Sequence, residues 1–428
     1  SGKRSRLLER AFKPRRKRLG FRRRRAMMGV HRQFQPYQSY QYLKTKDFPE
    51  FDLVEGEGPF PSYLLPLSPE KEKRALKLAE SCVIISLHEH PHLFPKDIRL
   101  CPAYDQQGRT VTAYEALAAS YWDAFFDNFQ DGTAIITSKN GWKWTDVIHD
   151  VGIRLCDLAH QDLVIKCETV DDIYRAHQTG KIALIAAQEG AAMIENELER
   201  IEILYGIGIR EMGITYSESN CLGTGLKEEK DGGLTSFGRR AVQRMNDVGM
   251  AVDCAHASPQ TTLDTIEASS KPIFLTHTGA RSVWNIKRLA PDEVLKACAG
   301  KGGVIGIEAA PHTTMSTKRP GHDLETYMEH FEYIAQLVGI DHVAFGPDTL
   351  YGDHVGVHHV YSAALSIEAS HEGGSPAYEE VEYVKGMENP TEASKNILRW
   401  LVEHDYSDRD IQKLLGENIL RVLKEVWQ

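Results

Sequence analysis

Two segments, GMAVDCAHAS at residues 249–258 and KPIFLTHTGAR at residues 271–281, indicate the fold. Each holds a short apolar run followed by a histidine, His256 or His277, and a helical pattern lies between them. Short runs rich in Val, Ile and Phe that alternate with helices are typical of buried parallel strands. Ser258, which is followed by proline, has the residue type that caps the start of a helix. The sequence therefore predicts two successive strands whose carboxyl ends both carry an imidazole.

The alternation of strand and helix continues along the chain. Apolar runs that we expect to form strands occur eight times, at residues 82–87, 133–137, 182–187, 210–215, 250–252, 272–275, 304–307 and 342–345. A further run, 163–167, is expected to be an extra strand, and the aromatic residues of 101–130 have helical spacing. Eight strand and helix units predict an α/β protein, a (β/α)8 TIM-type barrel, whose strands end at one common mouth.

Three regions are expected along the chain. Residues 1–30 form a basic, disordered tail, residues 31–81 an irregular arm with a lead-in helix, and residues 82–428 the barrel with two C-terminal helices. The first 32 residues hold 14 Lys or Arg and one acid, against 37 and 59 in the rest. Such a tail could bind nucleic acid or an anionic membrane, or act as a transit peptide. We favour a cloning remnant or upstream read-through, and expect no nucleic-acid partner unless the tail is native.

Composition limits the class of protein. With 428 residues, of which 42% are hydrophobic, the chain can bury one large core. No apolar run reaches the roughly 18 residues of a membrane span, so we expect no membrane partner. The seven cysteines are odd in number and form no CxxC pair. We therefore expect reduced thiols and a cytoplasmic localisation.

Polar side chains with metal-binding or hydrogen-bonding groups follow the predicted strands: His88, His90, Glu189, Tyr216, His256, His277 and Asp348. A lone histidine is more often structural than functional, but imidazoles and carboxylates at the ends of five strands indicate one shared site. Both are ligands of zinc and similar divalent ions. The HxH spacing places both imidazoles of the first strand on one face, and Glu89 between them is expected to point away. Three further histidines are expected in a solvated loop or, alternatively, at the pocket entrance: His354, His358 and His359.

Several motifs, in order from about residue 83 to residue 348, are similar to those of the membrane dipeptidase (renal dipeptidase) family: QEGA, GIGIREMGIT, GLTSFGRRAVQRMNDVGMAVDCAHAS, PIFLTHTGAR, KRLAPDEVL, GGVIGI and GIDHVAFGPD. The resemblance implies a (β/α)8 barrel with two zinc ions that hydrolyses dipeptides, including those with a D-residue at the C-terminal side. Some members of that family cleave β-lactams. Members are often dimeric, so a homodimer is also an expectation.

The same resemblance implies roles for individual residues. The first ion is bound by His88 and the residue two positions further on, Glu189 bridges the ions, and the second ion is bound by the remaining imidazoles, those of His256 and His277. Arg288 would grip a carboxylate of the substrate by bidentate pairing. Asp348 would take a proton from the attacking water and pass it to the leaving amine.

Two positions depart from the family pattern. His90 stands where the family has Asp, which raises the net charge of the ion cluster by one unit and should make a bound water more acidic. Tyr216 stands where the family has His near the substrate carbonyl. Its hydroxyl can donate a hydrogen bond to a developing oxyanion while remaining neutral.

The leading hypothesis is a binuclear zinc hydrolase that cleaves an amide bond of a small carboxylate-bearing substrate, such as a dipeptide or an N-acyl amino acid, with a hydroxide held between the ions. A second hypothesis keeps this chemistry but assigns another substrate, a lactone, cyclic amide or pathway intermediate, because His90 and Tyr216 alter the pocket. A third is a catalytically idle barrel that serves as a scaffold or, through its tail, as a nucleic-acid-binding protein.

Overall fold

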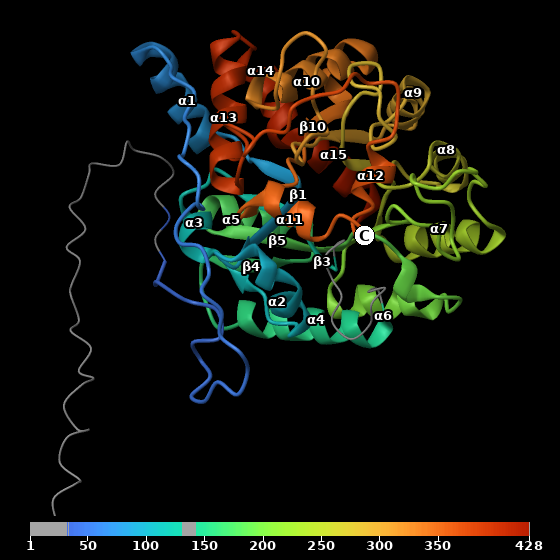
Figure 1. Cartoon of the computed structure of the whole chain (residues 1–428), viewed down its shortest axis with the longest axis horizontal. Coiled ribbons are helices and arrows are strands. Elements are labelled where there is room, and N and C mark those ends of the chain that lie inside the picture. Colours follow the sequence, from blue (N-terminus) through green and yellow to red (C-terminus); the bar gives the residue numbers. More distant parts are fainter. Residues whose placement is uncertain (1–31, 33, 131–142, 428) are drawn as a thin grey trace, which may run out of the picture.

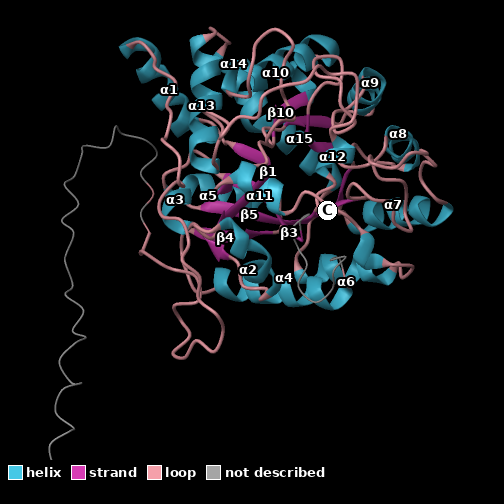
Figure 2. Ribbon diagram, viewed as in Figure 1, coloured by secondary structure: helices cyan, strands magenta, loops and turns pink. Residues whose placement is uncertain are grey.

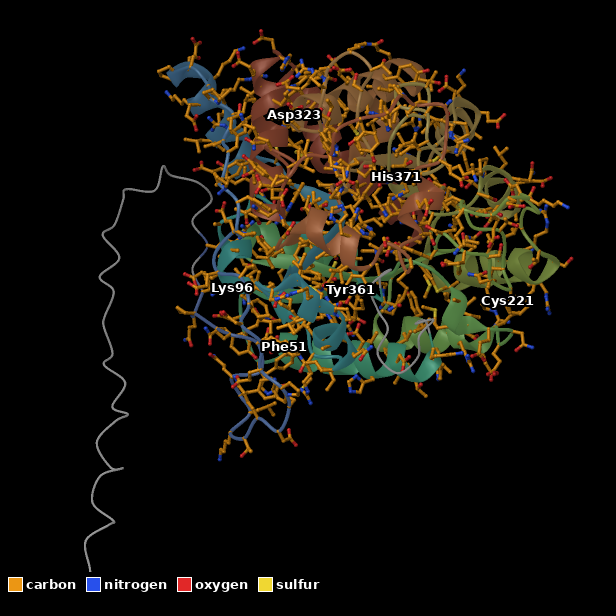
Figure 3. All side chains as sticks on the ribbon, in the orientation of Figure 1. Phe51, Lys96, Cys221, Asp323, Tyr361 and His371 are labelled. Atoms are coloured by element: carbon orange, nitrogen blue, oxygen red, sulfur yellow. The ribbon has the colours of Figure 1, made fainter. Side chains whose placement is uncertain are left out.

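A computed structural model describes residue 32, residues 34–130 and residues 143–427. Parallel strands lie at the centre, helices surround them, and side chains fill the space between (Figures 1, 2 and 3). Within the described residues, eight of these strands form the barrel: β1 (Ile85–Leu93), β3 (Ala124–Gln130), β5 (Ile182–Gln188), β6 (Glu211–Gly213), β7 (Ala251–Asp253), β8 (Phe274–Thr278), β9 (Val304–Ile307) and β10 (Val343–Phe345). They pair in the order β10-β9-β8-β7-β6-β5-β3-β1.

The segment after β10 closes the sheet into a barrel. Asp348 N donates to His88 O at 3.1 Å, and His90 N donates to Thr349 O at 2.9 Å. Directly after this, β11 (Leu350–Tyr351) pairs in parallel with β1. The prediction of a TIM-type barrel is therefore confirmed.

Helices connect successive strands and cover the outside of the barrel: α4 (Trp144–Leu158), α5 (Val170–Thr179), α6 (Glu199–Ile207), α7 (Ser236–Val248), α8 (Pro259–Ala268), α9 (Asp292–Gly300) and α10 (Leu324–Val338). The predicted start of α8 is confirmed, since the Ser258 side chain caps the helix by accepting from Thr261 N. The short elements β2 (Val111–Thr112), α2 (Cys101–Gln106) and α3 (Tyr114–Ala118) lie between β1 and β3, and β4 (Val164–Cys167) is the extra strand, paired with β5.

The C-terminal helices are α13 (Pro390–Glu403), α14 (Asp408–Gln412) and α15 (Asn418–Val426). Apolar residues of α15 pack in one cluster with residues near the starts of the barrel strands, such as Ile85, Ala124 and Phe274. A π-helical turn, Lys413–Glu417, separates α14 from α15. The second of the two predicted C-terminal helices was expected to run without a break over residues 408–427. A Cβ on Gly416 in this turn would lie 2.2 Å from Val83 O, so the turn packs directly against the chain that enters β1.

The aromatic stretch 101–130, for which a helical pattern was predicted, is only partly helical. Its last part, Ala124–Gln130, forms β3, the barrel strand between β1 and β5. The side chains of Phe125 and Phe126 are both fully buried, one facing each side of the strand, so the segment lacks the alternation that identifies a strand. The strand predicted at 133–137 lies outside the described residues. Strand β1 also starts later than predicted and continues through both histidines of the HxH pair.

The arm before the barrel, residues 34–68, contains neither helix nor strand and lies across the outer helices. Tyr37 Oη and Tyr40 N both donate to Asp157 of α4 at 2.7 Å. Near its end, Leu65 N donates to Asn396 of α13 at 2.8 Å. A lead-in helix, α1 (Pro69–Ser81), then reaches β1. Among the described residues, no helix has the length and apolarity needed to cross a membrane.

Candidate metal centre and substrate pocket

The first group of candidate ligands lies where β1 meets the segment after β10. The imidazoles of His88 and His90 are on the same face of β1, with their Nε2 atoms 3.2 Å apart. Asp348 Oδ1 lies 3.0 Å from the Nε2 atom of His90 and 3.4 Å from that of His88. The backbone of Asp348 has φ 58°, a left-handed conformation that is uncommon for residues other than glycine and is often found at functional sites.

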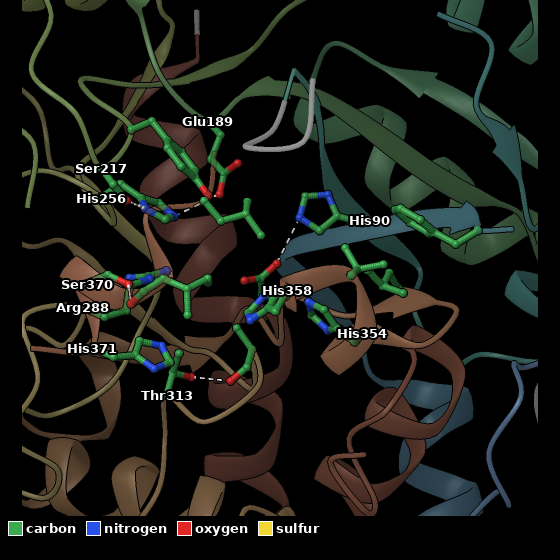
Figure 4. Close-up of a pocket in the computed structure, with 18 residues that line it drawn as sticks. His90, Glu189, Ser217, His256, Arg288, Thr313, His354, His358, Ser370 and His371 are labelled. Atoms are coloured by element: carbon green, nitrogen blue, oxygen red, sulfur yellow. Dashed lines mark hydrogen bonds and ion pairs between the residues drawn. The ribbon is translucent and has the colours of Figure 1, made fainter. Parts of the chain in front are cut away.

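The second group comes from β7, β8 and the end of β5. Glu189 Oε1 lies 3.0 Å from His256 Nε2 and 3.3 Å from His277 Nε2, and these two nitrogens are 3.0 Å apart. The same oxygen is 3.8 Å from the Nε2 atom of His88 in the first group. The structure thus brings all five predicted metal ligands together with Asp348. Figure 4 shows three of these ligands, His90, Glu189 and His256, around the pocket.

These groups fit divalent metal ions. Ligand atoms about 2.05 Å from a tetrahedral ion lie about 3.3 Å from one another, close to the separations in both groups. Burial lowers the pKa of His88, His256 and His277, which favours the neutral imidazole that binds metals. Burial alone would raise the pKa of Asp348, but the neighbouring imidazoles hold it well below its usual range. These three imidazoles and the Asp348 carboxylate are therefore present in their ligating forms.

A neutral polar side chain holds each of three ligand imidazoles at its other nitrogen. The Nδ1 atom of His88 lies 2.8 Å from the Asn128 amide, that of His256 lies 3.2 Å from Ser217 Oγ, and that of His277 lies 2.8 Å from Thr276 Oγ1. Such contacts fix ring orientation and leave Nε2 for the ion. The expectation that Glu89 points away is met, because its carboxylate accepts from Thr349 Oγ1 at 2.6 Å.

A pocket opens over the candidate ligands and is lined by residues from several elements. Tyr216 lines it and stacks on His256, with ring centroids 4.3 Å apart. Apolar residues form another part of the lining: Phe94, Leu350, Val357, Leu365 and Ile367.

The histidines expected in a solvated loop lie instead on a helix, α11 (His354–Val360). His354 and His358 line the pocket (Figure 4), while His359 is exposed and pairs with Glu380. After the short helix α12 (Ile367–Ser370), His371 also lines the pocket. Burial lowers the pKa of His354 and His371 to about 4, so both imidazoles are neutral near pH 7.

Arg288, the expected carboxylate ligand, lines the pocket too, but it is paired with a residue that the sequence analysis missed. Its Nη2 atom lies 2.6 Å from Glu308 Oε2, and both side chains are buried. Glu308 directly follows β9, so the same rule that found Glu189 and Asp348 would have found it. Asn128 was missed for another reason, because its segment was predicted to be helical.

Fold and site together define the class of protein: a parallel α/β barrel with a candidate metal centre at the carboxyl ends of its strands. The model of the membrane dipeptidase family, peptidase family M19, matches residues 115–365, which is more than half of the chain. The chain therefore belongs to the membrane dipeptidase family.

Individual relatives are distant. The chain is 23% identical over 316 residues to the dipeptidase tcpJ of Claviceps purpurea, a match that covers 72% of this chain and 66% of that protein. It is 26% identical over 270 residues to an uncharacterized protein encoded in the pqqA 5' region of Klebsiella pneumoniae, covering 61% of this chain and 89% of that protein. The chain thus spans slightly less than two thirds of the fungal relative.

Solved structures share the fold. An amidohydrolase from Pseudomonas aeruginosa superposes with a TM-score of 0.65 at 21% identity, over 82% of this chain and 99% of that chain. A metallopeptidase from Rhodobacter sphaeroides, bound to a phosphinate mimic of the dipeptide L-Ala-D-Ala, superposes with a TM-score of 0.61 at 18% identity, over 81% and 99%. At these identities the likeness demonstrates the architecture.

Proposed function

We propose that the chain is a metal-dependent hydrolase that cleaves an amide bond of a small substrate such as a dipeptide, with two zinc ions as cofactors. The observation that carries this proposal is the pair of ligand groups in contact through Glu189, whose Oε1 atom lies within 4 Å of three imidazoles. Family membership supports the reaction class. Divalent ions held there would polarise a carbonyl group and make a water molecule more acidic.

The chain's own residues supply the remaining steps. Asp348, ionised and beside His88 and His90, accepts the proton of the attacking water and returns it to the amine nitrogen as the C–N bond breaks. Tyr216, stacked on His256, donates a hydrogen bond to the oxygen of the attacked carbonyl group.

The test is turnover by zinc-loaded protein of L-L and L-D dipeptides, N-acyl amino acids and β-lactams. We expect hydrolysis of at least one of these classes, and loss of that activity in Glu189→Gln. Glu392→Gln is the matched control, because Glu392 is equally buried but lies at the start of α13 and does not line the pocket. If the protein hydrolyses none of these compounds, small amides of these kinds are excluded as its substrates.

A second candidate, hydrolysis of a lactone or cyclic amide, is favoured by the pairing of Arg288 with Glu308. Turnover of such compounds, with dipeptides left intact, would select it. An idle scaffold would instead hold less than one equivalent of transition metal after reconstitution.

A further inference from the structure

Arg288 has protein partners on most sides. Besides Glu308, its Nη2 atom donates to His277 O at 3.1 Å, and its Nη1 atom donates to Ala255 O at 3.0 Å. The side chains of Arg288 and Glu308 are 5% and 0% exposed. The guanidinium is thus held by one carboxylate and two carbonyl groups of the protein itself.

These contacts obstruct the side of the guanidinium that would bind a substrate carboxylate. A guanidinium binds a carboxylate in bidentate fashion through two parallel N–H bonds, either those of Nε and Nη2 or those of Nη1 and Nη2. Both arrangements need a hydrogen of Nη2. One hydrogen of that atom goes to the carbonyl group of His277, and Glu308 Oε2 lies 2.6 Å from the same nitrogen as an ion pair without a hydrogen bond, so a substrate carboxylate would have to compete with Glu308 for this atom.

Charge acts in the same direction. Glu308 is held in place because its backbone N–H donates to Thr278 O at 3.0 Å. Its carboxylate also belongs with Asp348 and His277 to one group of ligand-competent atoms, all within 4.8 Å of one another. A substrate carboxylate against Arg288 would therefore lie beside the Glu308 carboxyl group and near the ionised carboxylate of Asp348 in a buried environment, where like charges repel strongly.

The wall around Arg288 is neutral. Ser370, His371 and Thr313 lie on the same side of the pocket as Arg288 (Figure 4). Hydroxyl groups and a neutral imidazole donate and accept hydrogen bonds, and they suit an amide, ester or hydroxyl group of a ligand. The apolar lining from Phe94 to Ile367 suits an uncharged organic body next to that polar end.

We infer that Glu308 determines the substrate class: by occupying Arg288 it makes the pocket select small amides whose end beside Arg288 is uncharged, such as a C-terminally amidated dipeptide or a cyclic amide, over dipeptides with a free carboxylate. This inference rests on the proposed function, since it concerns the same pocket. It revises the expectation that Arg288 grips a substrate carboxylate.

Binding rather than turnover tests it. The probes are a phosphinate mimic of L-Ala-D-Ala and the same compound with a C-terminal amide, titrated calorimetrically into zinc-loaded protein at pH 7.5. We expect the amide to bind the wild-type protein at least tenfold more tightly. Glu308→Gln removes the ionisable carboxyl group and should narrow the ratio of the two affinities, while Glu308→Ala removes the whole side chain beside Nη2 and should abolish the preference. Glu392→Gln should keep the wild-type ratio.

The outcomes distinguish failure of the inference about Glu308 from failure of the proposed function. Tighter binding of the free carboxylate by the wild-type protein, or a ratio that both Glu308 variants leave unchanged, overturns the inference and leaves the proposed function intact. Failure of both probes to bind, with no dipeptide hydrolysed, overturns the proposed function and the inference with it. Zinc content and melting temperature are measured for each variant. If a variant does not fold, the ratio of the affinities of the wild-type protein for the two probes decides whether the inference holds.

Discussion

The orientation of single imidazoles depends on residues next to the ligands. Asn128 reaches His88 Nδ1 from the neighbouring strand β3, at 2.8 Å. For Nε2 to bind an ion, Nδ1 must carry the hydrogen, and the amide oxygen of Asn128 must accept it. Since amide oxygen and nitrogen atoms occupy equivalent positions, turning the Asn128 amide over provides this bond. Asn128 is therefore a positioning residue.

Asn128→Ala should weaken zinc binding about 10- to 100-fold, because the His88 ring loses the bond that fixes its orientation. Competition with a chromophoric chelator measures the affinity. Asn246→Ala is the control: Asn246 is also buried but accepts hydrogen bonds from Ser269 and Ser270, remote from the pocket. Equal zinc affinity in the Asn128 variant and the wild-type protein would contradict the positioning role.

At the scale of elements, the close approach of two strands places Glu189. A Cβ on Gly213 of β6 would lie 2.3 Å from the backbone oxygen of Glu189, directly after β5. Real Cβ atoms do not approach backbone oxygens this closely, so only glycine permits the observed spacing. The position of Glu189 beside the imidazoles therefore depends on a glycine in the next strand.

Gly213→Ala should displace Glu189 and reduce bound zinc, together with the melting temperature. Gly152→Ala is the control, because a Cβ at this exposed position in α4 meets nothing within 4 Å. That change should be neutral or stabilise by about 0.5–1 kcal/mol, as expected for alanine in a helix interior. Metal analysis and thermal unfolding compare the variants, and full zinc content in Gly213→Ala would refute the spacing argument.

A buried ion pair links α4 to the barrel. Arg154 of α4 bonds to Asp127 of β3 and lies 2.7 Å from His92 Nε2 of β1. Arg154→Met should cost about 3–5 kcal/mol of unfolding free energy, because it leaves the Asp127 carboxylate buried without its guanidinium partner. Urea unfolding measures this loss, and adding Asp127→Asn should restore part of it. A loss below 1 kcal/mol would show that the pair contributes little.

The same pair has a pH signature. Burial alone would raise the pKa of Asp127, but Arg154 and His92 outweigh it and lower the pKa to about 2. An unfolded aspartate has a pKa of about 3.9. A lowered folded pKa gives stability that is present above the unfolded value and is lost as the pH falls toward 2. Asp127→Asn should therefore lose less stability than the wild-type protein between pH 4 and pH 2.

At the scale of the whole molecule, the candidate metal centre joins segments that are far apart in the chain, from β1 to the segment that closes the barrel after β10. An ion that binds only the folded chain stabilises it, by about 2.7 kcal/mol at a free concentration of 100 times Kd. Chelation should lower the melting temperature, and zinc should restore it. In Glu189→Gln, chelation should lower the melting temperature by less than in the wild-type protein. A wild-type melting temperature that the chelator does not change would argue against a bound ion.

Features of the fold and the site that depend on local sequence patterns were predicted, whereas features that depend on long-range contacts were missed. Alternation of apolar runs and helices, with His256 and Glu189 directly after their strands, was enough to predict the barrel and most of the candidate site. The segment that became β3 was mistaken for a helix, because Phe125 and Phe126 are buried on both faces of the strand and carry no alternation. The pocket histidines of α11 were expected in a loop for a related reason, since only tertiary packing buries them.

The sequence by itself determined which chemical groups stand at the ends of the strands, because a strand directs its last side chains to one mouth whatever surrounds it. Tertiary structure decided which of those groups meet. The pairing of Arg288 with Glu308 and the contact of Asn128 with His88 join residues from different strands and loops. Their distances follow from how the sheet curls and closes, which no local pattern encodes.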